Sequence, residues 1–315
     1  AVYGNMNNHT FTNCTFQENC KTILNHQNPG PGAFLINDTA FYTIIDCSFI
    51  NNTGNAKGGA IMIYIKNIVE FDNARFIGNS LNNTFISEDP HSGGAIYINQ
   101  VIERYSSTPV PFTLRNCEFQ DNFIKTSKSL GGAIFIKFSD EYLVQLSPIT
   151  IEDCSFIRCS SSDRGGAISS GDGDWHSTKA TGDIILNYCN FTDCQSKYGG
   201  GIFCFNGNSN RDEDTNITNC IFDHCCSING GCIYSLSYKF HLENSLFINN
   251  DKLSSYSDDP NDYDGIDSFI FLKMDEANIN PLIINCTFKE NIISDIKADI
   301  DGTLTFVDCT FENYS

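Results

Sequence analysis

The sequence has no long apolar run, and its longest stretches of apolar residues, 60–65 and 269–272, are no longer than a strand. A membrane-spanning helix needs about 20 such residues, so no membrane insertion is expected. Basic residues are also scarce: 19 lysines and arginines stand against 38 acidic residues, for a net charge of −19. This balance argues against a nucleic acid partner, whose phosphates are bound by lysine and arginine. It favours a soluble surface that repels its own copies.

A helical pattern and a leader segment are missing as well. No stretch keeps apolar residues at the 3.6-residue period of a helix over three turns, so strands rather than helices are expected. The first residues do not show a charged segment followed by an apolar one, and we expect a signal peptide to be absent or already removed. The chain is nevertheless 41% hydrophobic, which is enough for a continuous core.

What the sequence does have is repetition. A short phrase, made of an apolar residue, a small or thiol residue, one spacer and a phenylalanine, occurs ten times at a mean interval of about 33 residues. Repeats of this size stack into solenoids in which each unit packs on its neighbours, so we expect residues 1–315 to form a single repeat domain. The repeated phenylalanines are Phe16, Phe49, Phe76, Phe119, Phe156, Phe191, Phe222, Phe247, Phe288 and Phe311.

Residues at fixed distances from the phenylalanine predict the geometry of the repeat. In the fullest copies a cysteine stands two residues earlier, as with Cys47 and Phe49, and in a strand the two would share a face. The residue before the cysteine would then face outward. These residues are Asn13, Asp46, Asn73, Asn116, Asp153, Asn219, Asn244, Asn285 and Asp308, with Tyr188 as the exception. Three residues after the phenylalanine, stacking predicts an amide ladder of Asn19, Asn52, Asn79, Asn122, Asn250 and Asn291, with Cys159, Cys194 and Cys225 in the middle repeats.

Paired glycines follow most copies of this phrase. Gly-Gly-Ala-Ile begins at residues 58, 93, 131 and 165, variants begin at 199 and 230, and a remnant stands at 32. Glycine pairs permit the positive φ of a tight corner, after which an apolar strand resumes. Each repeat therefore holds at least two strands and a corner, about what one turn of a parallel β-helix needs. The sequence predicts an all-β, single-stranded solenoid of about ten coils with loop insertions.

The two phrases resemble the repeats of the polymorphic outer membrane protein family of chlamydiae, whose signatures are a Gly-Gly-Ala-Ile-type tetrapeptide and Phe-x-x-Asn. The resemblance covers essentially the whole chain, with about seven glycine phrases and six copies of Phe-x-x-Asn. It implies a right-handed parallel β-helix and an adhesive role at the cell surface. The chain departs from the family after Phe247, where the glycine phrase is lost, so residues 251–315 are expected to be less regular. We also expect no membrane anchor of the family type.

Cysteines and glycosylation sequons both favour an extracellular or cell-surface protein. Because the 15 cysteines are an odd number, at least one thiol is free or pairs elsewhere. Most are expected to fill the core, although neighbours such as Cys159 and Cys194 would lie within disulfide reach. The nine sequons, a modest excess over chance, begin at Asn8, Asn13, Asn37, Asn51, Asn82, Asn190, Asn216, Asn285 and Asn313.

Variable spacing between the copies predicts insertions, which either bind partners or are plain solvated loops. The expected insertions are 81–92, 100–110, 170–182, 206–215 and 251–265. One acidic cluster either binds calcium or forms a plain acidic loop, since the EF-hand spacing is not met. The cluster consists of Asp258, Asp259, Asp262, Asp264 and Asp267. Trp175 either contacts a ligand such as a sugar or anchors its own loop.

One column of ionisable residues is a candidate for catalysis. Two residues after the phenylalanine, stacking would align Asp121, Arg158, Asp193 and His224 about 5 Å apart. Carboxylates on neighbouring coils can carry out acid–base chemistry on a glycosidic bond, whereas a surface charge ladder explains the same residues. The cysteines and histidines show no zinc-binding spacing. No catalytic, cofactor or metal residue is therefore assigned, with calcium as the open alternative.

These observations favour a non-catalytic extracellular structural protein, a β-helical rod that serves as an adhesin shaft or as a subunit of a cell-surface or filamentous assembly. Its partners would be further copies in head-to-tail contact, other surface proteins, or host or environmental glycans. We expect open coil ends, which favour such contacts or continuation in a longer protein. The alternatives are a carbohydrate-active β-helix enzyme, either a polysaccharide lyase or a glycoside hydrolase, and a calcium-stabilised binding module.

Overall fold

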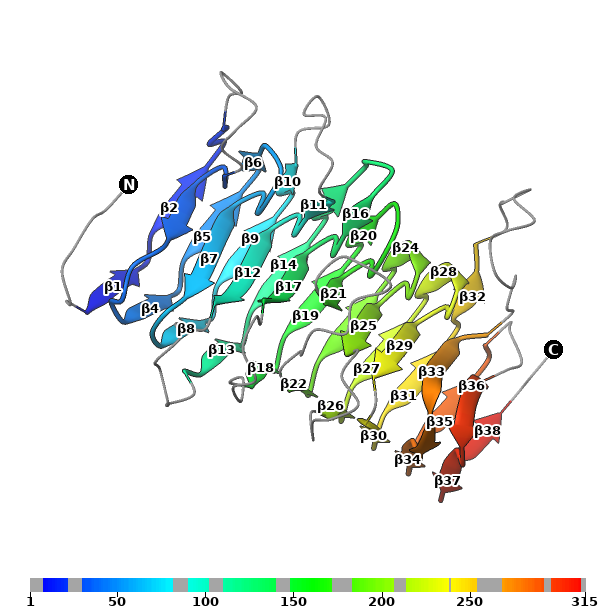
Figure 1. Cartoon of the computed structure of the whole chain (residues 1–315). Helices are drawn as coiled ribbons and strands as arrows, with labels where there is room; N and C mark the ends of the chain where they lie inside the picture. Colours follow the sequence, from blue (N-terminus) through cyan, green and yellow to red (C-terminus); the bar gives the residue numbers. More distant parts are fainter. Residues whose placement is uncertain are drawn as a thin grey trace.

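Strands wind into successive coils that stack in parallel along the molecule (Figure 1). The computed structural model describes residues 8–21, 30–81, 90–101, 110–139, 148–171, 183–206, 214–237, 239–253, 268–291 and 296–312. In these residues every regular element is a strand, and two of the sheets contain ten strands each. The chain is therefore an all-β parallel β-helix of ten coils, as the repeat predicts. The right-handed sense of winding stays a prediction.

Each coil contributes strands to as many as four sheets. The first sheet holds β1 (His9–Thr12), β4 (Tyr42–Ile45), β8 (Val69–Asp72), β13 (Phe112–Arg115), β18 (Ile149–Glu152), β22 (Ile184–Asn187), β26 (Asp214–Thr218), β30 (Lys239–Glu243), β34 (Leu282–Ile284) and β37 (Thr305–Val307). The second holds β2 (Thr15–Gln17), β5 (Ser48–Ile50), β9 (Arg75–Ile77), β14 (Glu118–Gln120), β19 (Ser155–Ile157), β23 (Asn190–Thr192), β27 (Ile221–Asp223), β31 (Leu246–Ile248), β35 (Thr287–Lys289) and β38 (Thr310–Glu312).

The other two sheets complete the coil. The third is short and holds β6 (Thr53–Gly54), β10 (Ser80–Leu81), β15 (Phe123–Ile124), β20 (Ser160–Ser161), β24 (Gln195–Tyr198), β28 (Cys226–Asn229) and β32 (Asp251–Lys252), with β11 (His91–Ser92) and β16 (Ser129–Leu130) as a separate pair. The fourth holds β3 (Phe34–Ile36), β7 (Ile61–Ile65), β12 (Ile96–Val101), β17 (Ile134–Ser139), β21 (Ile168–Gly171), β25 (Ile202–Asn206), β29 (Ile233–Ser237), β33 (Ile270–Ile279) and β36 (Ile296–Gly302).

The repeated phenylalanines form the predicted ladder inside the second sheet. Parallel pairing places Phe119 directly over Phe156, and their ring centroids are 4.9 Å apart with the planes 7° from parallel. The same stacking runs unbroken from Phe16 to Phe247 with centroid spacings of 4.7–4.9 Å. It continues to Phe311 with a larger tilt of 22–27°. The spacing is that of neighbouring strands, so each ring repeats the position of the one before it.

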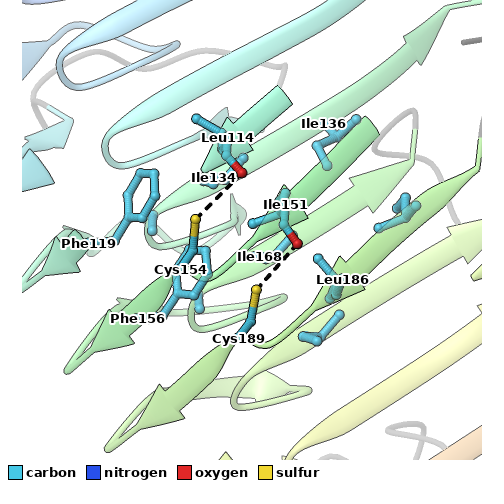
Figure 2. Close-up of a cluster of buried hydrophobic side chains, with 14 of the residues drawn as sticks. Leu114, Phe119, Ile134, Ile136, Ile151, Cys154, Phe156, Ile168, Leu186 and Cys189 are labelled. Atoms are coloured by element: carbon cyan, nitrogen blue, oxygen red, sulfur yellow. Dashed lines mark hydrogen bonds between the residues drawn. The ribbon is translucent and has the colours of Figure 1, made fainter. Parts of the chain in front are cut away.

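Thiols fill the core beside these rings, as expected. Cys154 and Cys189 are buried, and each sulfhydryl lies within hydrogen-bond distance of two backbone carbonyls. In the preceding coil these are Leu114 O at 3.7 Å and Ile151 O at 3.4 Å (Figure 2), and in the same coil Glu152 O at 3.2 Å and Asn187 O at 3.4 Å, respectively. Isoleucines and leucines of the first and fourth sheets pack against them from the other sides. A small thiol fits here because it fills the space and still satisfies its one weak donor.

The residue three positions before each repeated phenylalanine has a different role from the one predicted. It was expected to face outward from a strand that also carries the cysteine and phenylalanine. It is instead the corner between a first-sheet and a second-sheet strand, and all ten such residues have a positive φ of 47–56°. Asparagine and aspartate tolerate this left-handed conformation better than other side chains, which explains their recurrence. The preference therefore marks a corner rather than an exposed strand position.

The glycine pairs form another corner, before the fourth sheet. Gly58 and Gly93, the first members of two pairs, have φ values of 70° and 71°. Gly59 and Gly94, the second members, lie so close to the next coil that an added Cβ at either would overlap a backbone carbonyl oxygen there. The first glycine is thus required by conformation and the second by the close approach of neighbouring backbones.

A buried amide ladder lies at the turn after the second sheet, as predicted. Asn79 Nδ2 donates to Phe49 O at 2.8 Å and to Asn122 Oδ1 at 3.0 Å. Its own Oδ1 accepts both the backbone N–H and the side-chain amide of Asn52, each at 3.0 Å. In the middle coils the buried Cys159 takes the same place and donates to Phe119 O at 3.4 Å.

Aromatic side chains also pack outside the coil, on the fourth sheet. Tyr97, Phe135 and Phe203 alternate with interior isoleucines and belong to two clusters separate from the main core, yet each is at most 2% exposed. The Arg164 guanidinium lies 5.4 Å from the centre of the Phe203 ring, and the Lys57 ammonium lies 5.4 Å from that of Tyr97. This outer apolar layer was not foreseen from the sequence.

The described residues after 251 continue the first, second and fourth sheets but with a weaker repeat. The third sheet ends at β32. Pairing between β33 and β36 slips in register between Met274 and Ala277, and again between Ala277 and Ile279. No Gly-Gly phrase stands in this part of the chain to hold the corner.

Candidate functional site

The interior of the coil is filled, so functional side chains must come from its outer faces and corners. On the first sheet a polar track crosses neighbouring coils. Arg115 Nε lies 3.3 Å from Glu152 Oε2, and Asn187 Nδ2 donates to Glu152 Oε1 at 3.5 Å. Asn187 Oδ1 in turn accepts from Asn219 Nδ2 at 2.9 Å and from Thr218 Oγ1 at 3.0 Å. Equivalent positions on stacked strands thus hold one another in place.

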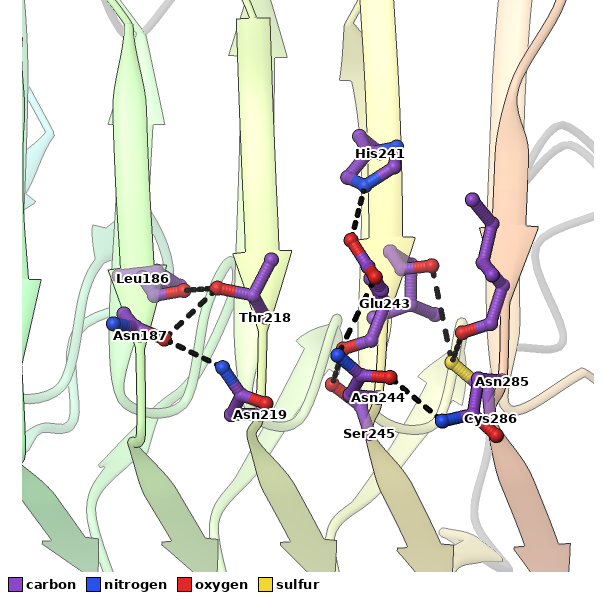
Figure 3. Close-up of polar contacts among 12 residues, drawn as sticks. Leu186, Asn187, Thr218, Asn219, His241, Glu243, Asn244, Ser245, Asn285 and Cys286 are labelled. Carbon is purple, nitrogen blue, oxygen red and sulfur yellow. Dashed lines mark hydrogen bonds and ion pairs between the residues drawn. The ribbon is translucent and has the colours of Figure 1, made fainter.

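A second set of contacts lies on β30 and at the corners that follow β30 and β34 (Figure 3). His241 Nε2 lies 3.1 Å from Glu243 Oε2, and Asn244 Nδ2 donates to the other oxygen of Glu243 at 3.4 Å. Asn285 Nδ2 then donates to Asn244 Oδ1 at 2.7 Å. The amides and carboxylates make this outer surface polar.

The proposed catalytic column lies at corners as well, not on a strand. Asp121, Arg158, Asp193 and His224 all have φ values of 51–54°. The Arg158 guanidinium donates two hydrogen bonds to Asp121, from Nε at 2.7 Å and from Nη2 at 2.9 Å. These bonds hold the pKa of the Asp121 carboxyl below its usual value, so this group stays ionised and is unsuited to act as a general acid. His224 Nδ1 pairs within its own coil, 2.6 Å from Asp223 Oδ1.

A shallow groove of about 280 Å³ lies near the start of the described chain. Thr10, Thr43 and Glu70 line it from the outer face of the first sheet, and Phe41 forms part of its wall with 43% of its surface exposed. Tyr42 also borders it, with its hydroxyl donating to Asp38 Oδ2 at 3.0 Å. Burial, supported by this contact, raises the pKa of Tyr42 to about 12, so the hydroxyl stays neutral. The groove offers hydroxyls and a carboxylate but no reactive pair.

Tyr188 is the corner residue that departs from the pattern. It has a φ of 52°, and 56% of its surface is exposed. Ile221, in the next coil, is 39% exposed. Sequence reasoning noted Tyr188 only as an exception to the Asn/Asp rule. That exception is the signal that could have singled it out.

The sequon asparagines lie mainly at the surface. Of the seven in the described residues, six are exposed: Asn8, Asn13, Asn37, Asn51, Asn190 and Asn285. Asn216 is half-buried, and Asn82 and Asn313 lie outside the described residues. Three of the exposed residues, Asn13, Asn51 and Asn285, stand at positive-φ corners, whereas Asn190 begins the extended strand β23.

The thiols form the most concentrated set of potentially reactive groups, and all fifteen are free in the structure. Burial raises the pKa of Cys204 to about 12 and those of Cys226 and Cys286 to about 11. A raised pKa removes the thiolate that nucleophilic chemistry requires, which identifies these cysteines as packing residues. Cys20 is exposed, Cys14, Cys226 and Cys309 are half-buried, and the other eleven are buried.

Other predicted features fall outside the described residues, namely Trp175 and the calcium candidates Asp258, Asp259, Asp262, Asp264 and Asp267. Within the described residues no group of three or more His, Cys, Asp or Glu side chains is placed to hold a metal ion. No helix in the same residues has the length and apolar character needed to cross a membrane.

The fold and its outer faces define a class, that of parallel β-helix repeat proteins with a packed interior and polar exposed corners. Comparisons with known proteins add no closer relationship: no protein-family model matches this chain, and no curated protein or solved structure does either. The resemblance to the chlamydial polymorphic outer membrane proteins therefore rests on the repeat motifs.

Proposed function

We propose that this chain is a non-catalytic extracellular structural protein, a β-helical rod that serves as an adhesin shaft or as a subunit of a cell-surface or filamentous assembly. The observation that carries the proposal is the continuous stack. Ten coils pair in register and share one core, with aromatic and amide ladders running through neighbouring coils. A stack in which each coil packs on the next is suited to act as a spacer and to present side chains on its outer faces to partners.

The outer faces support this assignment. The polar side chains of the track on the first sheet bond to one another, and Arg158 pairs with Asp121, a carboxylate of the candidate acid–base column. Six exposed sequon asparagines are compatible with passage through a secretory pathway. The net charge of −19 favours dispersal of copies along their sides, so self-association is proposed to run head to tail. Other surface proteins and host or environmental glycans are the further proposed partners.

The test combines localisation with imaging. Antibodies raised against the folded protein should label the surface of intact, unpermeabilised cells, and negative-stain images of native material should show rods, single or joined end to end. Label that appears only after permeabilisation would contradict the extracellular assignment.

Activity measurements test the alternative. Reducing-end and unsaturated-product assays on acidic polysaccharides should remain at background. Turnover that is abolished by Asp121→Asn or Asp193→Asn would instead identify a carbohydrate-active enzyme.

A further inference from the structure

Tyr188 adopts a backbone conformation that is unfavourable for a bulky side chain. Asn or Asp occupies the equivalent corner in the other nine coils, and these residues fit a positive φ with little strain. A bulky residue in this conformation is an outlier that the surrounding structure must hold in place. The corner amides also bond to their neighbours, as Asn219 does to Asn187 and Asn285 to Asn244. A tyrosine ring cannot replace that amide, and it stands 56% exposed.

A glycosylation sequon begins two residues after this tyrosine. It reads Asn190-Phe191-Thr192 and opens strand β23. Cys189 and Phe191 are fully buried, whereas Asn190 is exposed, so the alternation turns the Asn190 side chain outward. Tyr188, at the corner, and Asn190, at the start of β23, are therefore both exposed, and two residues of chain separate them by at most about 7 Å.

We propose that Asn190 carries an N-linked glycan and that the exposed ring of Tyr188 packs against its first N-acetylglucosamine. This proposal rests on the proposed extracellular function, since attachment takes place in a secretory pathway. The Asn190 amide nitrogen forms a bond to the anomeric carbon of a lipid-diphosphate-linked oligosaccharide. The bond from that carbon to the diphosphate breaks, the diphosphate leaves with the electron pair, and the Nδ2 proton is released. The C–H face of the sugar then covers the ring, as apolar groups cover aromatic faces elsewhere.

The structure distinguishes this sequon from the other sequons that also have an aromatic residue two positions before the asparagine. An aromatic residue also stands two positions before Asn13, Asn51 and Asn313, as Phe11, Phe49 and Phe311. Phe311 is 50% exposed but stacks on Phe288 at a centroid distance of 4.9 Å, and Asn313 lies outside the described residues. Phe49 is 0% exposed inside the ladder, and Phe11 packs against the main core. Neither ring is available to a sugar on the outer surface. Tyr188, unlike Phe11, Phe49 and Phe311, is not part of the ring stack or the core, because its backbone forms the corner.

The experiment uses the full chain secreted from a eukaryotic host that performs N-glycosylation. Glycopeptide mass spectrometry should find Asn190 occupied. Urea unfolding is then measured for the wild type, Tyr188→Asn, Asn190→Gln and the double variant. The glycan should raise the folding equilibrium constant about fivefold when Tyr188 is present, the range of an aromatic contact, and less than about twofold when it is replaced. An unoccupied Asn190, or the same glycan effect with and without Tyr188, would overturn the proposal.

Matched variants separate the contact from general effects of glycosylation. Asn285 is an exposed sequon residue whose neighbour two positions earlier, Ile283, is buried. Asn285→Gln combined with Tyr188→Asn should show no coupling. Tyr188→Phe should keep the coupling because the ring remains. Since these measurements need only a glycosylating host, they fail or succeed independently of where the native protein resides, which surface labelling decides.

Discussion

The amide ladder gives the most direct test of the stacked architecture, and Asn79→Ala is the perturbation that probes it. Asn79 is completely buried between two further ladder asparagines. Its side chain takes part in four hydrogen bonds of 2.8–3.0 Å. Alanine removes all four and leaves the backbone N–H of Asn52, one of its side-chain N–H groups and the Phe49 carbonyl without these partners.

The expected loss follows from the groups left unsatisfied. A buried donor or acceptor without a partner costs about 1–3 kcal/mol, and at least two donors of Asn52 are orphaned here. We expect the free energy of unfolding to fall by about 3–5 kcal/mol. Asn79→Cys should lose only about half as much, because Cys159, in the same ladder position, still donates to the carbonyl of the preceding phenylalanine.

Urea unfolding followed by far-UV circular dichroism measures this difference. With the slope of a chain this size, Asn79→Ala should lower the midpoint by about 1–2 M urea. Asn116→Ala is the matched control, since this exposed corner asparagine donates one side-chain hydrogen bond, to Asp72 at 2.8 Å, and should lose only about 1 kcal/mol. Equal losses for the buried and the exposed asparagine would refute the reasoning that the ladder stabilises the stack.

Three further predictions follow from the corners, thiols and charges. Gly94→Ala should prevent folding or lower stability by more than about 3 kcal/mol, whereas Gly231→Ala, whose Cβ would have 3.2 Å or more to its neighbours, should cost under about 1 kcal/mol in the same urea assay. In the native protein at pH 8, Ellman's reagent should react rapidly with the exposed Cys20 and more slowly with the half-buried Cys14, Cys226 and Cys309, and all 15 thiols should react after denaturation; rapid reaction of the buried thiols would contradict the packed core. Because Arg158 lowers the pKa of Asp121 below its ordinary value of 3.8, this pair should stabilise the fold above that pH and lose its effect as the pH falls through the lower, folded-state value; NMR titration of Asp121 should move back toward 3.8 in Arg158→Gln.

The ladder position after the second sheet is a cysteine in the middle coils and an asparagine in the coils on either side. Cys159 and Asn79 both donate to a phenylalanine carbonyl of the preceding coil, at 3.4 and 2.8 Å. The amide adds a bond to the next ladder residue, whereas the thiol offers only a weak donor and a weak acceptor. We infer that the middle coils are held more by apolar packing, and the flanking coils more by hydrogen bonds.

Much of the architecture was accessible from the sequence because parallel in-register stacking places equivalent residues over one another. Any position that must be aromatic, amide or glycine in one coil must be similar in the next. The spacing of Phe119 and Phe156, the asparagines three residues later and the glycine pairs therefore predicted coils, ladder and corner. The Asn/Asp preference was visible too, but its interpretation as an outward strand position was wrong, because asparagine and aspartate fit both an exposed strand position and a sharp corner.

The sequence by itself determined that the chain coils, how many coils it makes and which side chains fill the interior, since those features repeat at a fixed interval. The tertiary structure alone decided which side chains stand outside the coil and whether they are covered. Phe49 and Tyr188 both precede a sequon by two residues, yet one is 0% and the other 56% exposed. Tyr97 and Phe203 alternate outward from their strands but are buried in an outer layer. Periodicity fixes the face of a strand, whereas corners and packing between elements fix exposure, and exposure determines what a side chain can bind.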